Sequence, residues 1–202
     1  MKSRVSHAHR IAKEYDGILP YHEIFYIRSI RFSTGRALTA FARYAEALKS
    51  PQSETRSEDL VFGLYEAIGH CAAVSRYFWP TSEEKLPVAR ATRLREAFGM
   101  NDDDPLYRVR SIRNGVEHFD ERLDRFCAKD PVGTIFDLVV DSEDLVDEQV
   151  THVLRLVDPA AQTVVLFGKK YCFAGLQSSI ERIQQAAEKM DRMGGRLDPG
   201  VR

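Results

Sequence analysis

The sequence is poor in cysteine, has a single tryptophan and lacks long apolar runs. Its three cysteines, Cys71, Cys127 and Cys172, lie far apart and form no CxxC pair, which argues against a disulfide framework or a zinc site. No stretch approaches the roughly 18 apolar residues of a membrane span. The first ten residues, MKSRVSHAHR, hold no apolar core of signal-peptide length. We therefore expect a cytoplasmic protein without membrane contact.

An excess of charge of one sign is also missing. The 202 residues include 29 Lys and Arg against 30 Asp and Glu, so the net charge is −1. Such a chain generates no global positive field, and any binding of nucleic acid must come from a local patch. The length and the 44% of hydrophobic residues predict one globular domain with a sizeable core.

Motifs for metal and nucleotide chemistry are missing as well. The chain has no HExxH sequence, no Walker pattern and no serine or cysteine in a nucleophile-elbow context. His7 and His9 lie two apart in a polar segment, which makes no preorganised metal site. The segment 167–170, FGKK, is too short for a phosphate loop. We expect no metal site and no cofactor.

Helical periodicity runs through most of the chain. Apolar residues three and four apart predict long helices over 21–49, 57–79, 83–98, about 105–126 and 173–190. Ser57 would cap the second of these helices, and Asp104 the fourth, with Pro105 as its first residue. Residues 1–19 are expected to form a polar N-terminal arm or a frayed helix, and residues 194–202 a disordered tail.

The pattern changes to that of strands between the last two helices. Segments 134–140, 151–157 and 163–167 are β-branched or alternating, and the turn at 158–161 would join the last two as a hairpin with the first beside them. The acidic segment 141–148 predicts a solvated loop or a short helical turn. We therefore expect a mainly α protein: an antiparallel up-and-down bundle of four to five long helices over 20–193, with a β insertion at about 134–168.

The fourth helix carries the residues with the most chemistry. At about 100° per residue, Asn114 and His118 fall opposite the apolar stripe and Arg113 lies between the two faces. Asn114 and His118 are four residues apart and could form a hydrogen bond. A guanidinium can bind phosphate bidentately, and an imidazole moves protons near neutral pH. Together these groups suit metal-free phosphodiester cleavage, with a 2′-hydroxyl of RNA as the nucleophile.

Other arginines would extend such a site along an RNA backbone. The RNA-binding candidates are Arg110, Arg122, Arg125, Arg36 and Arg43. The last two share the first long helix with aromatic residues that could stack bases. The same residues also fit a solvated helix surface, on which Arg113 pairs with Glu117 and Arg125 with Glu121 at the i,i+4 spacing.

The segment Arg113 to His118, RNGVEH, resembles the Arg-polar-x-x-x-His motif of HEPN (higher eukaryotes and prokaryotes nucleotide-binding) domains. The resemblance implies an up-and-down bundle with the motif on a late helix. It also implies that Arg113 binds the scissile phosphate, that His118 transfers protons and that Asn114 fills the polar position. One subgroup of the family has a tyrosine where this chain has Asp120, so chemistry through that tyrosine is not implied.

The resemblance also implies what the protein does and with whom. Many members of the family are metal-independent endoribonucleases that dimerise so that two motifs share a cleft. Some are toxins or defence components with an antitoxin or nucleotidyltransferase partner, and others are inactive modules that bind a protein or nucleotide. We expect an endoribonuclease that acts on RNA as a homodimer. A silent binding module and a structural protein without a site remain open alternatives.

Overall fold

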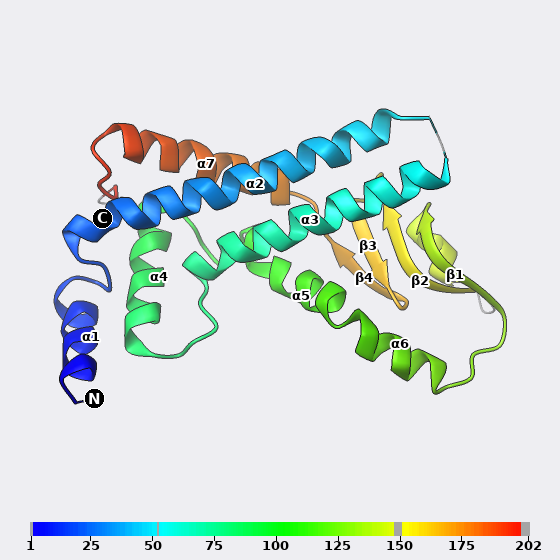
Figure 1. Cartoon of the computed structure of the whole chain (residues 1–202), viewed down its shortest axis with the longest axis horizontal. Coiled ribbons are helices and arrows are strands. Elements are labelled where there is room, and N and C mark those ends of the chain that lie inside the picture. The colour runs from blue at the N-terminus through cyan, green and yellow to red at the C-terminus, as the bar shows by residue number, and fades with distance from the viewer. Residues whose placement is uncertain (1, 52, 148–150, 199–202) are drawn as a thin grey trace.

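The computed structural model describes residues 2–51, 53–147 and 151–198 (Figure 1). In these ranges the chain is mainly helical and carries one four-stranded sheet before the last helix. The helices are α1 (Lys2–Glu14), α2 (Glu23–Lys49), α3 (Glu54–Phe78), α4 (Lys85–Phe98), α5 (Pro105–Glu117), α6 (Phe119–Cys127) and α7 (Leu176–Arg192). The strands are β1 (Thr134–Val140), β2 (Thr151–Asp158), β3 (Thr163–Leu166) and β4 (Lys169–Cys172), with short 3₁₀ helices η1 (Pro20–His22) and η2 (Glu143–Asp147).

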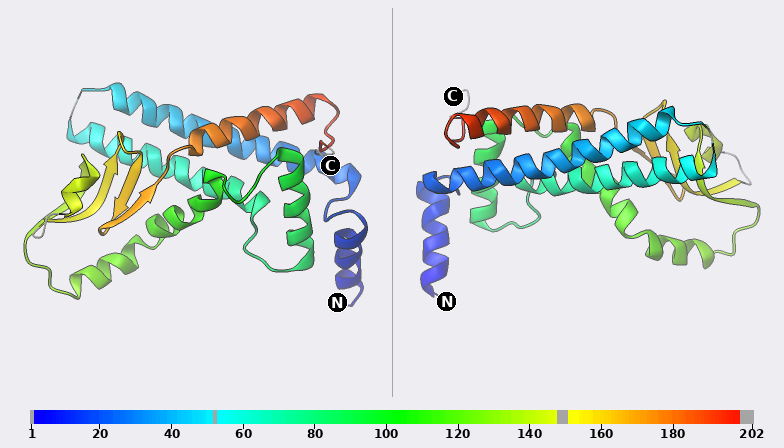
Figure 2. Two further views of the ribbon diagram at one scale, coloured as in Figure 1. Left: turned by 180° about the vertical axis from the view of Figure 1, so that it is seen from behind. Right: turned by 45° about the horizontal axis from the view of Figure 1, so that its top comes forward.

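Four helices form the antiparallel bundle that the sequence predicts. Helix α2 packs against α3 and α7, and α5 packs against the same two helices, so the four close into a ring. Their directions alternate along the chain (Figures 1 and 2). Helices α1 and α4 pack on each other and stand across one end of the bundle (Figure 1). The sheet lies at the opposite end, beside α6.

The bundle is held by one continuous apolar core. Its fully buried side chains include Ile27 and Ile30 of α2, Leu64 and Phe78 of α3, and Ile112 of α5. Burial of each such side chain stabilises the fold by about 1.5–3 kcal/mol. Packing in this core therefore determines which face of α5 points inward and which face is exposed to solvent.

Side-chain caps fix the starts of α5 and α3, and the second of these differs from the expectation. Helix α5 begins as predicted, because the Asp104 carboxylate accepts a hydrogen bond from the Leu106 N–H at 2.9 Å and Pro105 is the first residue. Helix α3 begins three residues before the predicted Ser57. Ser53 is its cap and accepts from the Arg56 N–H at 3.1 Å.

The sheet has the order β1-β2-β3-β4, with β1 and β2 parallel and the other neighbours antiparallel. The predicted hairpin between β2 and β3 is confirmed, and η2 is the predicted short helical turn. Strand β4 was not predicted, and the insertion ends at Cys172 rather than at 168. The two-residue turn before it has φ of +49° at Phe167 and +77° at Gly168, as a type I′ turn requires. The first turn position holds Phe167 rather than the Asn, Asp or Gly that usually marks a type I′ turn, so the sequence does not predict it.

The N-terminal segment takes the helical form of the two expected, and the described C-terminal residues are more structured than expected. The predicted arm is the helix α1, followed by a turn at Gly17 that lies against α4. Residues 194–198 of the predicted disordered tail pack on the bundle. There Leu197 is buried, and the Glu23 carboxylate accepts from the Leu197 N–H at 3.0 Å and pairs with Arg196 at 2.6 Å. Residues 199–202 lie outside the described residues.

Candidate functional site

The RNGVEH segment lies at a joint between two helices. Helix α5 ends at Glu117 and α6 begins at Phe119, because His118 leaves the helical conformation with φ −102° and ψ 36°. The prediction of one continuous helix over 105–126 is therefore wrong. The apolar stripe continues across the joint, but it changes partner from the bundle to the sheet.

Ring contacts with the sheet explain why the chain bends at this point. The Phe119 and Phe167 rings lie 4.8 Å apart, and Phe126 lies 5.5 Å from His152 and 6.0 Å from Phe167. Strands β3 and β4 also press on α5 at Gly115. A Cβ there would stand 2.8 Å from Cδ1 of Leu166. In a straight helix, a single apolar stripe could not pack on both the bundle and the sheet. The joint at His118 therefore turns α6 so that its part of the stripe faces the sheet.

Arg113 is held locally on one side of the joint. Its side chain is only 18% exposed, and its Nε lies 3.0 Å from Oε2 of Glu117. Its Nη2 also donates to Oδ1 of Asn114 at 2.9 Å. The predicted i,i+4 pair with Glu117 is confirmed. The expected side-chain bond between Asn114 and His118 is not formed among the described contacts, because Asn114 serves Arg113 instead.

His118 is the exposed member of the motif. Its side chain is 56% exposed, and Nδ1 lies 3.1 Å from Oε1 of Glu121. The second oxygen of Glu121 accepts from Arg125 at 3.0 Å. A carboxylate on Nδ1 fixes the orientation of an imidazole and leaves Nε2 to exchange a proton with a ligand. Sequence reasoning placed Glu121 only in the pair with Arg125; its i,i+3 spacing from His118 was the signal for this second role.

The five RNA-binding candidates occupy four different places. Arg110 is exposed on α5, and Arg125 lies beside the joint. Arg122 donates to the Tyr171 hydroxyl at 3.0 Å and so ties α6 to β4. Arg36 and Arg43 line a pocket of about 460 Å³ on α2 and α3, where Arg43 pairs with Glu66. Because α5 packs on α3 and α7, the described contacts do not bring these two arginines to the motif.

The cysteines divide into one inert and two accessible thiols. Burial raises the pKa of Cys71 to about 12, so its thiol stays protonated at neutral pH. Cys127 and Cys172 are both exposed. In the described ranges, no group of three or more His, Cys, Asp or Glu residues is placed to hold a metal ion.

No protein-family model, curated protein or solved structure matches the chain. None of the described helices is both long enough and apolar enough to span a lipid bilayer.

Proposed function

We propose that the chain is a metal-independent endoribonuclease of HEPN type, acting at the joint between α5 and α6. The observation that carries the proposal is the half-exposed His118 imidazole, held at Nδ1 by Glu121 at 3.1 Å. Arg113 precedes it by five residues and is flanked by the Asn114 amide. This arrangement supplies a proton carrier, its orienting carboxylate and a cation within one helical joint.

The chemistry of such a site needs no nucleophile from the protein. His118 Nε2 would take the proton of a ribose 2′-hydroxyl while its oxygen attacks the adjacent phosphorus. The bond from phosphorus to the 5′-oxygen breaks, and that oxygen receives a proton from solvent or a second imidazole. The products are a 2′,3′-cyclic phosphate and a 5′-hydroxyl. Arg113 would turn from Glu117 to the phosphoryl oxygens, where negative charge develops.

The setting of the reaction is part of the same proposal. The protein would act in the cytoplasm as a homodimer whose two joints face one RNA strand. It would serve as a toxin or defence component, restrained by an antitoxin or a nucleotidyltransferase partner. A dimer supplies a second imidazole to protonate the leaving oxygen, which one isolated joint lacks.

A second candidate function is a catalytically inactive module that binds a protein or nucleotide. It is favoured by the ion pairs already present at the joint. Arg113 is largely buried against Glu117, and Glu121 bridges His118 and Arg125. A nuclease must break the first of these pairs before phosphate can bind, whereas a binding module can keep them.

Cleavage of RNA in EDTA by wild-type protein, His118→Ala and His9→Ala separates the two functions. His9 is an exposed histidine of α1, so its variant controls for loss of an imidazole elsewhere. We expect His118→Ala to lower the rate by about 10²–10⁴-fold and His9→Ala to leave it unchanged. Equal rates in wild type and His118→Ala would refute the nuclease assignment and leave the binding module.

A further inference from the structure

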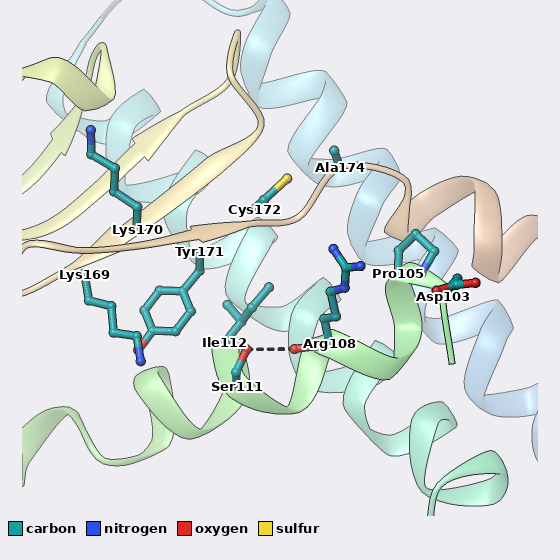
Figure 3. A pocket seen from close by; sticks show the side chains of 10 residues that line it. All are labelled: Asp103, Pro105, Arg108, Ser111, Ile112, Lys169, Lys170, Tyr171, Cys172 and Ala174. Carbon is teal, nitrogen blue, oxygen red and sulfur yellow. Dashed lines mark hydrogen bonds between the residues drawn. The ribbon is translucent and has the colours of Figure 1, made fainter. Parts of the chain in front are cut away.

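A pocket of about 320 Å³ lies between α5 and the edge strand β4 (Figure 3). Helix α5 contributes Arg108 and Ser111, and β4 contributes Lys169, Tyr171 and Cys172. The two elements are about sixty residues apart in the sequence, so only the fold brings these side chains together. The volume falls at the lower end of the roughly 300–1,000 Å³ of small-ligand sites.

Arg108 and Lys169 give the pocket one cation from each of its two walls. Among the described contacts, neither Arg108 nor Lys169 has a carboxylate at ion-pair distance, and the Lys169 ammonium lies 5.1 Å from the centre of the Tyr171 ring. Lys170 and Cys172 border the pocket but point to the opposite side of the strand from Lys169 (Figure 3), and Lys170 pairs with Glu143. Asp103 stands at the end of the pocket near Pro105 (Figure 3). Two like charges gathered in one hollow favour a bound anion.

The hydroxyl and main chain of the pocket add donors to these charges. Ser111 Oγ donates to the main-chain oxygen of Arg108 at 2.8 Å and can rotate to donate to a ligand instead. Lys169 and Leu166 close the β3–β4 turn, so the alternating ladder directs the N–H of Cys172 out of the open sheet edge. Cations, a hydroxyl and an N–H are the groups that proteins use to hold phosphate oxygens.

We propose that this pocket is a second phosphate subsite, which binds the backbone of single-stranded RNA beside the scissile bond. The proposal rests on the proposed nuclease function. Ser111 and His118, the C-cap residue of α5, are seven residues or about two turns apart, so His118 follows the side of α5 that carries Ser111. Arg108 and His118 are ten residues apart, which corresponds to about 15 Å along a helix. A single strand of a few nucleotides spans that distance. The Arg108–Lys169 pair would set the position of the strand relative to the imidazole.

An extended acidic peptide could also add to the β4 edge. RNA is favoured because the two cations lie on the two walls of the pocket rather than along the strand edge. Strand β4 carries one further cation, Lys170, and that side chain pairs with Glu143.

Measuring RNA binding in a variant that does not cleave RNA tests the subsite separately from catalysis. In the His118→Ala background, the anisotropy of a labelled single-stranded RNA is measured for Arg108→Ala/Lys169→Ala. The matched control is Lys189→Ala/Arg192→Ala, which removes the same charges from exposed positions at the far end of α7. We expect the first pair to raise Kd by about tenfold or more and to reduce the salt slope by about 1.4, that is about 0.7 per lost phosphate contact. We expect the control to change Kd by no more than about twofold.

The exposed cysteines provide a second measurement within one chain. Cys172 lines the pocket, and Cys127 lies exposed at the end of α6. We expect RNA to slow alkylation of Cys172 severalfold more than that of Cys127. Equal binding by the two double variants, unprotected Cys172, or binding of a poly-glutamate peptide in place of RNA would overturn the subsite. If the subsite is confirmed but His118→Ala still cleaves, only the catalytic assignment fails.

Discussion

Gly17 lies against α4 in a contact that a residue with a Cβ does not permit. Its φ is +83°, and a Cβ at this position would stand 2.1 Å from the backbone nitrogen of Arg90 in α4. We expect Gly17→Ala to lower the free energy of unfolding by about 1–3 kcal/mol, because it combines a strained conformation with a backbone clash. Urea denaturation measures the change.

Gly35 offers the opposite case in the same chain. It lies inside α2, and no atom outside its own helix comes within 4 Å of a Cβ built there. We expect Gly35→Ala to raise the free energy of unfolding by about 0.5–1 kcal/mol, since alanine loses less backbone entropy in a helix. If both glycine variants lost stability equally, the contact at Arg90 would not be the cause of the Gly17 effect.

The start of α3 tests capping at the scale of an element. Ser53 accepts from the Arg56 N–H, whereas the hydroxyl of Ser57 donates back to the Ser53 carbonyl at 3.3 Å. We expect Ser53→Ala to destabilise the protein by about 0.5–2 kcal/mol and Ser57→Ala by less than about 0.5 kcal/mol. Thermal denaturation of both variants measures the two changes. A larger loss of stability in Ser57→Ala than in Ser53→Ala would contradict this assignment of the cap.

Asp158 joins two elements of the β insertion. Its carboxylate accepts from the N–H groups of Ala160 and Ala161 at 2.9 Å and of Glu143 at 3.0 Å. Burial alone would raise the pKa of this carboxyl, but the three N–H donors outweigh it and hold the pKa below its ordinary value. The charged form is therefore the one that stabilises the turn and the start of η2.

The lowered pKa of Asp158 makes the stability of the insertion depend on pH. A carboxyl with a depressed pKa contributes stability that is complete above its unfolded pKa of about 4 and is lost as the pH falls toward the folded value. We expect Asp158→Asn to cost about 1–3 kcal/mol at pH 7, and progressively less below about pH 4. Denaturant titrations of both proteins from pH 7 to pH 3 measure the difference. A constant difference across that range would show that the charge plays no part.

The elements that sequence reasoning anticipates are those set by local periodicity. The long helices and the β2–β3 hairpin follow from apolar spacing and turn residues that lie within a few positions. The break at His118 does not, because the stripe keeps its period on both sides and only the distant Phe167 ring shows that its partner changes. Likewise, the Arg113–Glu117 pair follows from spacing, whereas the pocket at Arg108 and Lys169 depends on tertiary packing.

Burial is unevenly distributed over the whole molecule. Helices α2, α3, α5 and α7 each place several fully buried side chains in the core. Helix α6 has no buried side chain, and neither has α1 over residues 7–14. The stability of a segment against local opening follows the apolar surface that it buries. The RNGVEH segment therefore ends where the tightly packed bundle gives way to a loosely packed helix.

Hydrogen exchange should show this boundary directly. We expect amides in the middle of α2, α3, α5 and α7 to exchange only on global unfolding, and those of α6 and α1 to exchange at least about 100-fold faster through local opening. Peptide-resolved mass spectrometry of the native protein measures these rates. Because α6 carries Glu121, which holds the His118 ring, its opening would release the imidazole, and an RNA that engages the joint should slow exchange in α6 but not in α1. Uniform protection across α5 and α6 would show instead that the joint is as rigid as the bundle.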